Sequence, residues 1–116
     1  MKFYYNGKLV RTSKTHEYKF AAMLDGRCLK SSATREGAQE EIERSLRELN
    51  HRIEAEKNAL KALESGESMF RSGKNWVKID RKWHTAENLT KWIKADTETR
   101  NHIKANAQVV ELEARA

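Results

Sequence analysis

The stretch that decides the fold runs from Thr34 to Gly66 and reads TREGAQEEIERSLRELNHRIEAEKNALKALESG. Its large apolar residues recur at steps of three, four and seven, which places them on one side of an α-helix. Only Glu56 interrupts this stripe. The sequence therefore predicts one long amphipathic helix over about residues 34–65, with a stripe made of Ile42, Leu46, Leu49, Ile53, Leu60 and Leu63.

Both ends of the predicted helix carry recognisable signals. Thr34 can accept hydrogen bonds from the free N–H groups of the first turn, and Glu36 places negative charge at the positive end of the helix dipole. Gly66 can adopt the left-handed conformation that ends many helices. We therefore expect the helix to begin just after Thr34 and to end just before Gly66.

The stripe must be covered by another apolar surface. From Leu46 to Leu63 its spacing also fits a coiled-coil heptad, with Glu56 at one d position, so a second copy of the chain could share the seam. A helix predicted at residues 85–95, together with the N-terminal strands, could cover it instead. The six stripe residues are thus candidates for a dimer interface or for an intrachain core.

Residues 3–31 predict two antiparallel hairpins. Asn6-Gly7 and Asp25-Gly26 are strong two-residue turn signals, because their residues tolerate positive φ. In the third predicted strand, alternation puts Phe20, Ala22 and Leu24 on the side expected to pack on the long helix, with Tyr18 at its start. Four basic or aromatic residues are expected on the open face as candidate nucleic-acid contacts: Lys2, Tyr4, Arg11 and Lys19.

Residues 67–75 predict a loop, followed by a short strand at residues 76–80 and a helix capped by Thr85. A break at residues 96–99 would start a short third helix. Residues 107–116 fit either an edge strand or a helix, and Asn106 favours the strand. Gly73-Lys74 does not form a phosphate loop, because the spacing to Gly66 and the residue after the lysine are both wrong.

Three tryptophans, Trp76, Trp83 and Trp92, lie among Lys and Arg residues. Such interleaving can stack bases while neutralising phosphates. The same tryptophans could instead be packed in the core, or could line a ligand pocket together with His84. The candidate nucleic-acid contacts in this segment are Lys74, Lys78, Arg81 and Lys82.

Charge is distributed unevenly along the 116 residues, whose net charge is +6. Residues 1–35 contain eight Lys or Arg against two acids, residues 36–65 contain five against eight, and residues 66–116 contain ten against seven. The basic character therefore belongs to the segments that flank the long helix. A positive surface can attract nucleic acid, or it can serve solubility.

The composition excludes several protein classes. A single cysteine, Cys28, rules out an internal disulfide and multi-cysteine zinc sites, and we expect it to be a small buried residue. No apolar run is long enough to span a membrane, and the first residues lack the apolar core of a signal peptide. We expect a soluble, cytoplasmic protein with no membrane partner.

No catalytic constellation is evident. The four histidines are spread along the chain without metal-ligand spacing, and neither a nucleophile elbow nor a dinucleotide fingerprint occurs. Neighbouring carboxylates on the long helix diverge by about 100°. The sequence therefore predicts a protein that is not an enzyme, with no catalytic residues, no metal site and no cofactor.

One architectural likeness joins Thr34 and Ala38 to the hairpins before them. Short strands followed by a Thr-capped helix with this Thr-x-x-x-Ala pattern loosely resemble the arm-type DNA-binding domain of phage and transposon integrases. The resemblance covers the first third of the chain, and the helix here departs from the pattern in its length. We treat it as an analogy of architecture, not as membership of that family.

Together these patterns predict a single α+β domain over residues 1–116. It comprises a basic hairpin region at 1–33, the long helix at 34–66 and a Trp/Lys-containing strand-helix region at 67–116. The leading functional hypothesis is a non-catalytic protein-interaction module that forms a homodimer or binds another protein. The alternative is a nucleic-acid-binding accessory protein that uses the basic hairpins and the Trp/Lys segment.

Overall fold

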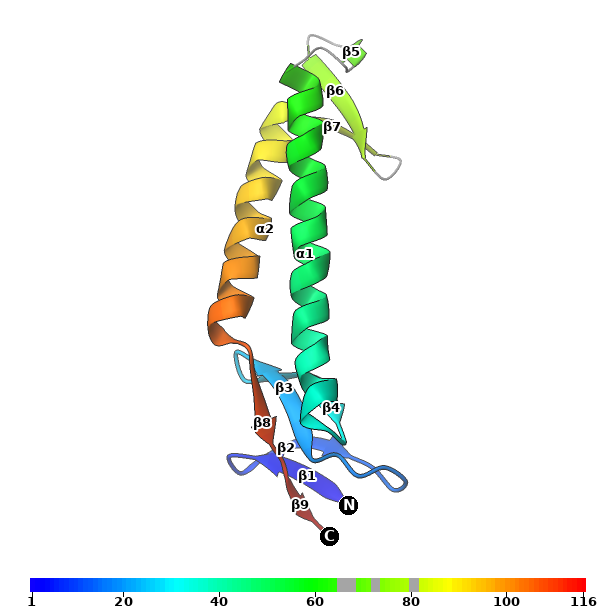
Figure 1. Cartoon of the computed structure of the whole chain (residues 1–116), viewed down its shortest axis with the longest axis vertical. Helices are drawn as coiled ribbons and strands as arrows, with labels where there is room; N and C mark the ends of the chain where they lie inside the picture. Colours follow the sequence, from blue (N-terminus) through cyan, green and yellow to red (C-terminus); the bar gives the residue numbers. More distant parts are fainter. Residues whose placement is uncertain (65–68, 72–73, 80–81) are drawn as a thin grey trace. The chain divides into compact units, whose positions relative to one another are not determined.

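The computed structural model describes residues 1–64, 69–71, 74–79 and 82–116. It has the predicted α+β architecture, with antiparallel hairpins, one long helix and a second helix (Figure 1). The chain divides into two compact units: unit 1 is Met1–Leu46 with His102–Ala116, and unit 2 is Arg47–Asn101. The elements are β1 (Lys2–Tyr5), β2 (Lys8–Thr12), β3 (Phe20–Leu24), β4 (Arg27–Ser32), α1 (Arg35–Glu64), β5 (Met69–Arg71), β6 (Lys74–Ile79), β7 (Lys82–Thr85), α2 (Ala86–Asn106), β8 (Gln108–Glu111) and β9 (Glu113–Arg115).

The two predicted hairpin turns are confirmed in unit 1. Asn6 and Asp25 both have φ of 51°, and Gly7 and Gly26 both have φ of 78°. Positive φ at both central residues defines the type I′ turn, whose twist matches that of the flanking strands. Each Asn-Gly or Asp-Gly pair therefore fixes a hairpin, β1–β2 or β3–β4.

The C-terminal segment forms two strands, β8 and β9, and each adds a third strand to one sheet of unit 1. The strand orders are β2-β1-β9 and β4-β3-β8, so the chain end pairs with the chain start (Figure 1). The two C-terminal strands follow one another, and between them Leu112 donates its backbone N–H to the carbonyl of Lys19 at 2.8 Å. The preference for a strand over a helix at residues 107–116 is therefore confirmed.

Strand β3 is buried on both of its faces. Ala21 and Met23 form a core cluster with Val110, against which Tyr5, Val10 and Leu112 pack. The opposite side is also covered, since Ala22 is fully buried and the Arg35 guanidinium of α1 lies 4.9 Å from the Phe20 ring centroid. The expectation that only the Phe20 side would be covered is wrong, because β1 and β2 supply a second covering layer.

Helix α1 begins where the sequence predicts. The hydroxyl of Thr34 accepts a hydrogen bond from the N–H of Gly37 at 3.0 Å, so Thr34 is the N-cap. Glu36 lies in the first turn, where its negative charge interacts favourably with the positive end of the helix dipole. The first part of this 30-residue helix belongs to unit 1 and the remainder to unit 2.

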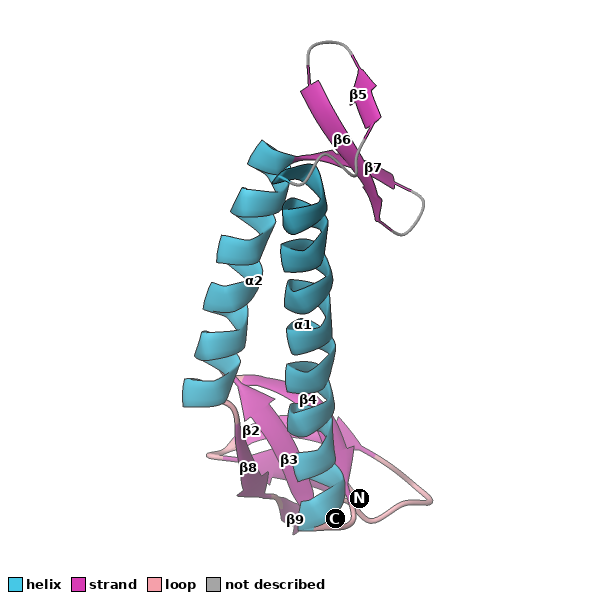
Figure 2. Ribbon diagram, turned by 45° about the horizontal axis from the view of Figure 1, so that its top comes forward, coloured by secondary structure: helices cyan, strands magenta, loops and turns pink. Residues whose placement is uncertain are grey.

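Unit 2 contains more strand than the sequence predicts. Strands β5, β6 and β7 form a three-stranded antiparallel sheet in that order (Figure 2). The loop predicted at 67–75 is wrong where β5 and the start of β6 lie, and β7 was not predicted. Strands of three or four residues show too little alternation of apolar and polar side chains to be recognised from the sequence. Strands β5 and β7 are defined instead by their hydrogen-bonded pairing with β6.

Helix α2 is continuous, so the predicted break at residues 96–99 is wrong. The hydroxyl of Thr99 donates to the carbonyl of Ala95 at 3.0 Å, and Thr90 does the same to Ala86 at 2.8 Å. Threonine side chains that bond four residues back are satisfied within a helix and need not end it. The predicted cap is confirmed, since Thr85 accepts from the N–H of Asn88 at 3.4 Å.

The core of unit 2 is built from both helices and the sheet. Ala59 and Leu63 of α1 cluster with Leu89 of α2, and Leu60, Val77 and Ile79 pack against them. Leu89 is fully buried. The end of the apolar stripe is thus covered within the chain by α2 and the hairpin sheet.

Cys28 lies exposed on β4, which corrects the expectation of a buried cysteine. Among the described strands, β4 pairs with β3 alone, and its residues Arg27 to Lys30 are all exposed. A cysteine at the outer edge of a sheet has no apolar layer over it. Among the described residues, no helix is both long and apolar enough to cross a membrane.

Candidate functional site

The six stripe residues are largely covered in a single chain. Leu46 and Leu60 remain half-buried. The other four are buried, with exposed fractions of 5% for Ile42, 8% for Leu49, 1% for Ile53 and 6% for Leu63. Four of the six stripe residues therefore belong to the buried core of a single chain.

Glu56 is buried in this stripe, where the sequence pattern is interrupted. The residue is 2% exposed, and among the described residues neither carboxyl oxygen has a hydrogen-bond partner. Burial raises the pKa of Glu56 from 4.5 to about 7; the nearby Asp96 carboxyl adds to the rise and Arg52 opposes it. At neutral pH this carboxyl is therefore divided between its protonated and ionised forms.

Asp96 of α2 is the residue that faces Glu56. Its carboxylate lies 3.6 Å from the Arg52 guanidinium, and the Asp96 side chain is 18% exposed. The Arg52 side chain is 62% exposed, so this ion pair sits at the edge of the helix pair. One arginine thus serves two carboxyl groups, and its single charge balances only one of them.

A cavity of about 650 Å³ lies beside these groups in unit 2. Its aromatic wall comes from Trp92, whose ring packs against the His84 ring with centroids 4.4 Å apart and planes at 63°. His84 is 6% exposed and Trp92 is 43% exposed. Charged and titratable groups around the cavity are Glu48, His51, Arg52, Glu56, His84 and Asp96.

This cavity relates directly to the sequence hypotheses. A pocket near Trp83, His84 and Trp92 was expected for a ligand-binding protein, and two of these three residues line it. Asp96 was not recognised from the sequence, because no local pattern reveals which residue of one helix faces Glu56 on another. The signal that could have pointed here is Glu56 itself, a charge at an apolar position.

The candidate nucleic-acid contacts of β1 differ in their exposure in unit 1. Lys2 is exposed and Tyr4 is half-buried. The guanidinium of Arg115, on the neighbouring strand β9, lies 4.6 Å from the Tyr4 ring centroid. Arg115 was not predicted as part of this surface, because its pairing with β1 spans the length of the chain.

Arg11 and Lys19 occupy different surroundings from Tyr4. Arg11 is the ladder partner of Phe3, and its guanidinium lies 4.5 Å from the centroid of the Tyr18 ring. Tyr18 in turn packs edge-on against the buried Phe3 ring, with centroids 5.7 Å apart. Lys19 is exposed and lies 4.0 Å from Glu17. Arg11 therefore contacts Tyr18 and pairs with Phe3, whereas Tyr4 contacts Arg115.

The β6–β7 ladder brings another predicted contact beside a tryptophan. Lys78 and Trp83 are direct partners across the two strands, and the ammonium lies 5.9 Å from the ring centroid. Both residues are exposed, with Trp83 at 45%. Of the other predicted contacts, Arg81 and the side chains of Lys74 and Lys82 lie outside the described residues.

Potential metal-ligating side chains are dispersed in the described part of the chain. There, no group of three His, Cys, Asp or Glu side chains is placed to hold a metal ion. His16 bonds to the Thr15 hydroxyl at 2.8 Å, and His102 bonds to Asp25. Each of these histidines has a local structural partner.

Comparison of the chain with protein-family models, with curated proteins and with solved structures finds no match.

Proposed function

We propose that this protein is a non-catalytic nucleic-acid-binding protein that holds a single strand on the outer face of the β5–β6–β7 sheet. The observation that carries the proposal is the exposed cross-strand pair of Lys78 and Trp83. An exposed aromatic ring can stack on a base of any sequence, and an adjacent ammonium can neutralise a phosphate. Such a pair supplies both elements of sequence-tolerant binding to a single strand.

The register of the ladder adds a second ring to this face. Side chains alternate along a strand, so Trp76 lies on the same side of β6 as Lys78. Trp76 pairs with Thr85, while Val77 and Ile79 of the opposite side pack against the apolar core cluster of unit 2. This side of the sheet therefore carries the half-buried Trp76 next to Lys78 on β6, with the exposed Trp83 opposite Lys78 on β7.

Charge also favours a nucleic acid over an acidic or neutral partner surface. Residues 71–82 contain five Lys or Arg against one Asp. An anionic strand releases counterions when it binds such a segment, which gives affinity that depends strongly on salt. This net charge of +4 within twelve residues is complementary to a phosphate backbone.

Self-association through the α1 stripe is the competing hypothesis. Its motivation was an apolar seam in need of a cover, and four of the six stripe residues are buried in a single chain. This burial weakens the reason for proposing a coiled-coil dimer. Sedimentation of the protein at high micromolar concentration provides the check: a stable dimer that binds no nucleic acid would favour the interaction module instead.

Fluorescence anisotropy with labelled dT20 and rU20, at low and at moderate salt, tests the proposal. Binding should weaken as salt rises, and Trp83→Leu should weaken it about tenfold, since a stacked base contributes roughly 1–3 kcal/mol. Trp83→Phe, which keeps a ring, is the matched control and should retain most of the affinity. Equal losses in both variants would contradict the stacking role.

The electrostatic part of the proposal has its own control. Lys78→Ala should weaken binding and lower the slope of log K against log salt by about 0.7, as expected for one lost phosphate contact on a single strand. Lys57→Ala removes the same charge from an exposed position on α1 and should change neither quantity. The absence of any binding at low salt would overturn the proposed function.

A further inference from the structure

We propose that Glu56 is a proton-operated latch between α1 and α2 in unit 2. With its proton in place the carboxyl stays buried against α2; once ionised, it leaves the interface and the helix pair opens at this level. This inference does not depend on nucleic-acid binding. It begins from the place of Glu56 in the stripe, between the buried residues Ile53 and Ala59.

The buried carboxyl is stable there only in its neutral form. Neither oxygen of Glu56 makes a direct hydrogen bond among the described residues, and the Asp96 carboxyl, the polar group whose side-chain hydrogen bonding does act on Glu56, favours its protonated form. Moving an ionised carboxylate out of water without such partners is far costlier than moving a neutral one. The geometry therefore couples the position of this side chain to its protonation.

The surrounding charges do not change this conclusion. Arg52 is 3.6 Å from the Asp96 carboxylate, which already balances its charge. The other charged or titratable groups facing Glu56 are Glu48 and His51 of α1 and His84 of β7. A second negative charge beside Asp96 would remain uncompensated by Arg52.

The cavity gives the ionised carboxylate somewhere to go. It holds about 650 Å³, and Glu56 forms part of its wall. The side chains of Arg52 and Trp92 at its edge are exposed to solvent. Release of Glu56 into this space requires local separation of α1 and α2, not unfolding of either helix.

The direction of the pH effect follows from the buried state. The pKa of Glu56 is about 7 in the closed form and returns to its ordinary value of 4.5 once the side chain reaches water. The closed form therefore binds more protons than the open form between these values. Its extra stability is fully present below pH 4.5 and is lost as pH rises through 7.

Native-state hydrogen exchange on the full chain measures this opening. After correction for intrinsic exchange, the opening constant of amides around positions 56 and 96 should rise roughly tenfold between pH 6 and pH 8. Amides of β3 in unit 1 serve as the internal reference. An opening constant that stays flat or falls over this range would overturn the latch.

Two glutamate variants isolate the group responsible. Glu56→Gln keeps the size but cannot ionise, so its opening constant should lose the rise seen in the native protein. Glu54→Gln makes the same charge change at an exposed position of the same helix and should retain the rise. His51 and His84 are present in every variant, so the difference between the native protein and Glu56→Gln belongs to Glu56. Equal pH dependence in these two proteins would overturn the proposal.

A direct titration keeps the latch testable if a variant folds poorly. The side-chain carboxyl of Glu56, followed by ¹³C NMR in the native protein, should titrate near pH 7. Titration near 4.5, the ordinary value, would show that the carboxyl is not held in a buried neutral form and would overturn the latch.

Discussion

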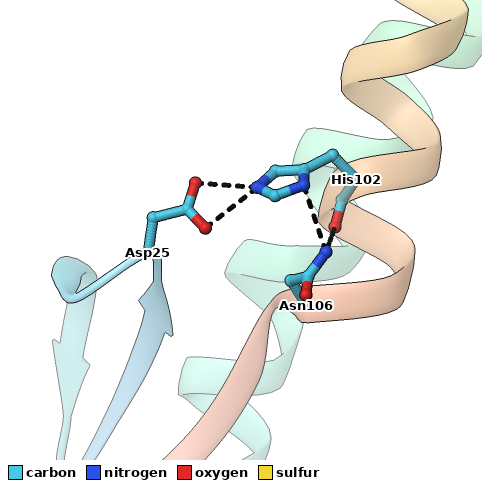
Figure 3. A network of polar contacts seen from close by, with 3 residues as sticks. All are labelled: Asp25, His102 and Asn106. Carbon is cyan, nitrogen blue, oxygen red and sulfur yellow. Dashed lines mark hydrogen bonds and ion pairs between the residues drawn. The ribbon is translucent and has the colours of Figure 1, made fainter.

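Asp25 and His102 are 77 positions apart in the chain, yet Nε2 of His102 lies 2.7 Å from Oδ2 of Asp25 and 2.9 Å from Oδ1 (Figure 3). Both residues belong to unit 1. Asp25 is the first residue of the β3–β4 turn, and His102 lies near the end of α2. The pair therefore fastens a hairpin turn to a helix distant in sequence.

Asn106 sets which ring nitrogen of His102 carries the proton. Its side-chain nitrogen lies 3.0 Å from the His102 carbonyl oxygen and 3.1 Å from Nδ1 (Figure 3). As a donor, the amide requires Nδ1 to accept, which leaves Nε2 to donate to Asp25. A neutral imidazole with its proton on Nε2 satisfies all of these contacts.

A double-mutant cycle of Asp25→Ala and His102→Ala should give a coupling of about 0.5–1 kcal/mol in the free energy of unfolding. The value is modest because the side chains are 60% and 48% exposed, so water competes for the contact. Urea denaturation of the four proteins measures it. Additive single-variant effects would show that the contact adds no stability.

Loss of the α1 cap should destabilise the protein. Thr34→Ala removes the hydroxyl that accepts from Gly37 and should lower the free energy of unfolding by about 1 kcal/mol. Thr34→Ser keeps the hydroxyl and should lose far less. Thr85→Ala should cost less than Thr34→Ala, since its capping bond is longer, 3.4 Å against 3.0 Å. Thermal unfolding followed by circular dichroism gives this order, and equal costs for the Ala and Ser variants at position 34 would contradict it.

Gly37 lies inside helix α1, yet replacing it by alanine should lower the stability of the protein. A Cβ there would collide with the Ser32 side-chain oxygen, which also accepts from the N–H of Thr34 at 3.2 Å. Gly37→Ala should therefore destabilise the protein, although alanine is favoured over glycine by about 1 kcal/mol in helices.

The same change in a Ser32→Ala background tests the cause. With the oxygen removed, Gly37→Ala should cost less than it does in the native protein, because the closest atom is gone. Chemical denaturation of the native protein, both single variants and the double variant provides the comparison. A cost at Gly37 that is unchanged by Ser32→Ala would contradict the proposed collision.

Leu89, the one leucine of α2, should be costly to truncate. It is fully buried in the cluster with Ala59 and Leu63, so Leu89→Ala should cost about 2–5 kcal/mol through lost burial and an unfilled cavity. Leu9→Ala makes the same change at a residue that is 54% exposed and should stay within about 0.5 kcal/mol of the native protein. Similar losses in the two variants, measured by urea denaturation, would argue against this core.

Locally encoded features of the fold could be predicted from the sequence alone. The stripe of α1 follows from a period of 3.6, and each hairpin turn follows from two residues that accept positive φ. The Thr34 and Thr85 caps follow from a side chain that bonds to its own helix. Each of these depends on neighbours within a few positions, so the sequence contains the whole signal.

Other features depended on contacts between distant segments. Thr99 is a polar residue typical of a helix break, but its hydroxyl is satisfied inside a continuous α2. Cysteine is a residue type that is usually buried, but Cys28 lies exposed on an edge strand. The short β5 and β7 become strands through their ladders with β6. Local propensity cannot decide such cases, because the energy that decides them comes from pairing and burial.

The sequence by itself determined that residues 34–65 form a helix with one apolar side, interrupted at Glu56. Only the tertiary structure decided that Leu89 and the β6 side chains cover the end of that stripe, and that Asp96 stands beside Glu56. Helical periodicity is a property of successive residues, so a single segment reveals it. Which segment covers the stripe, and whether a carboxyl there is held neutral, depends on the free energy of packing between segments far apart in the chain.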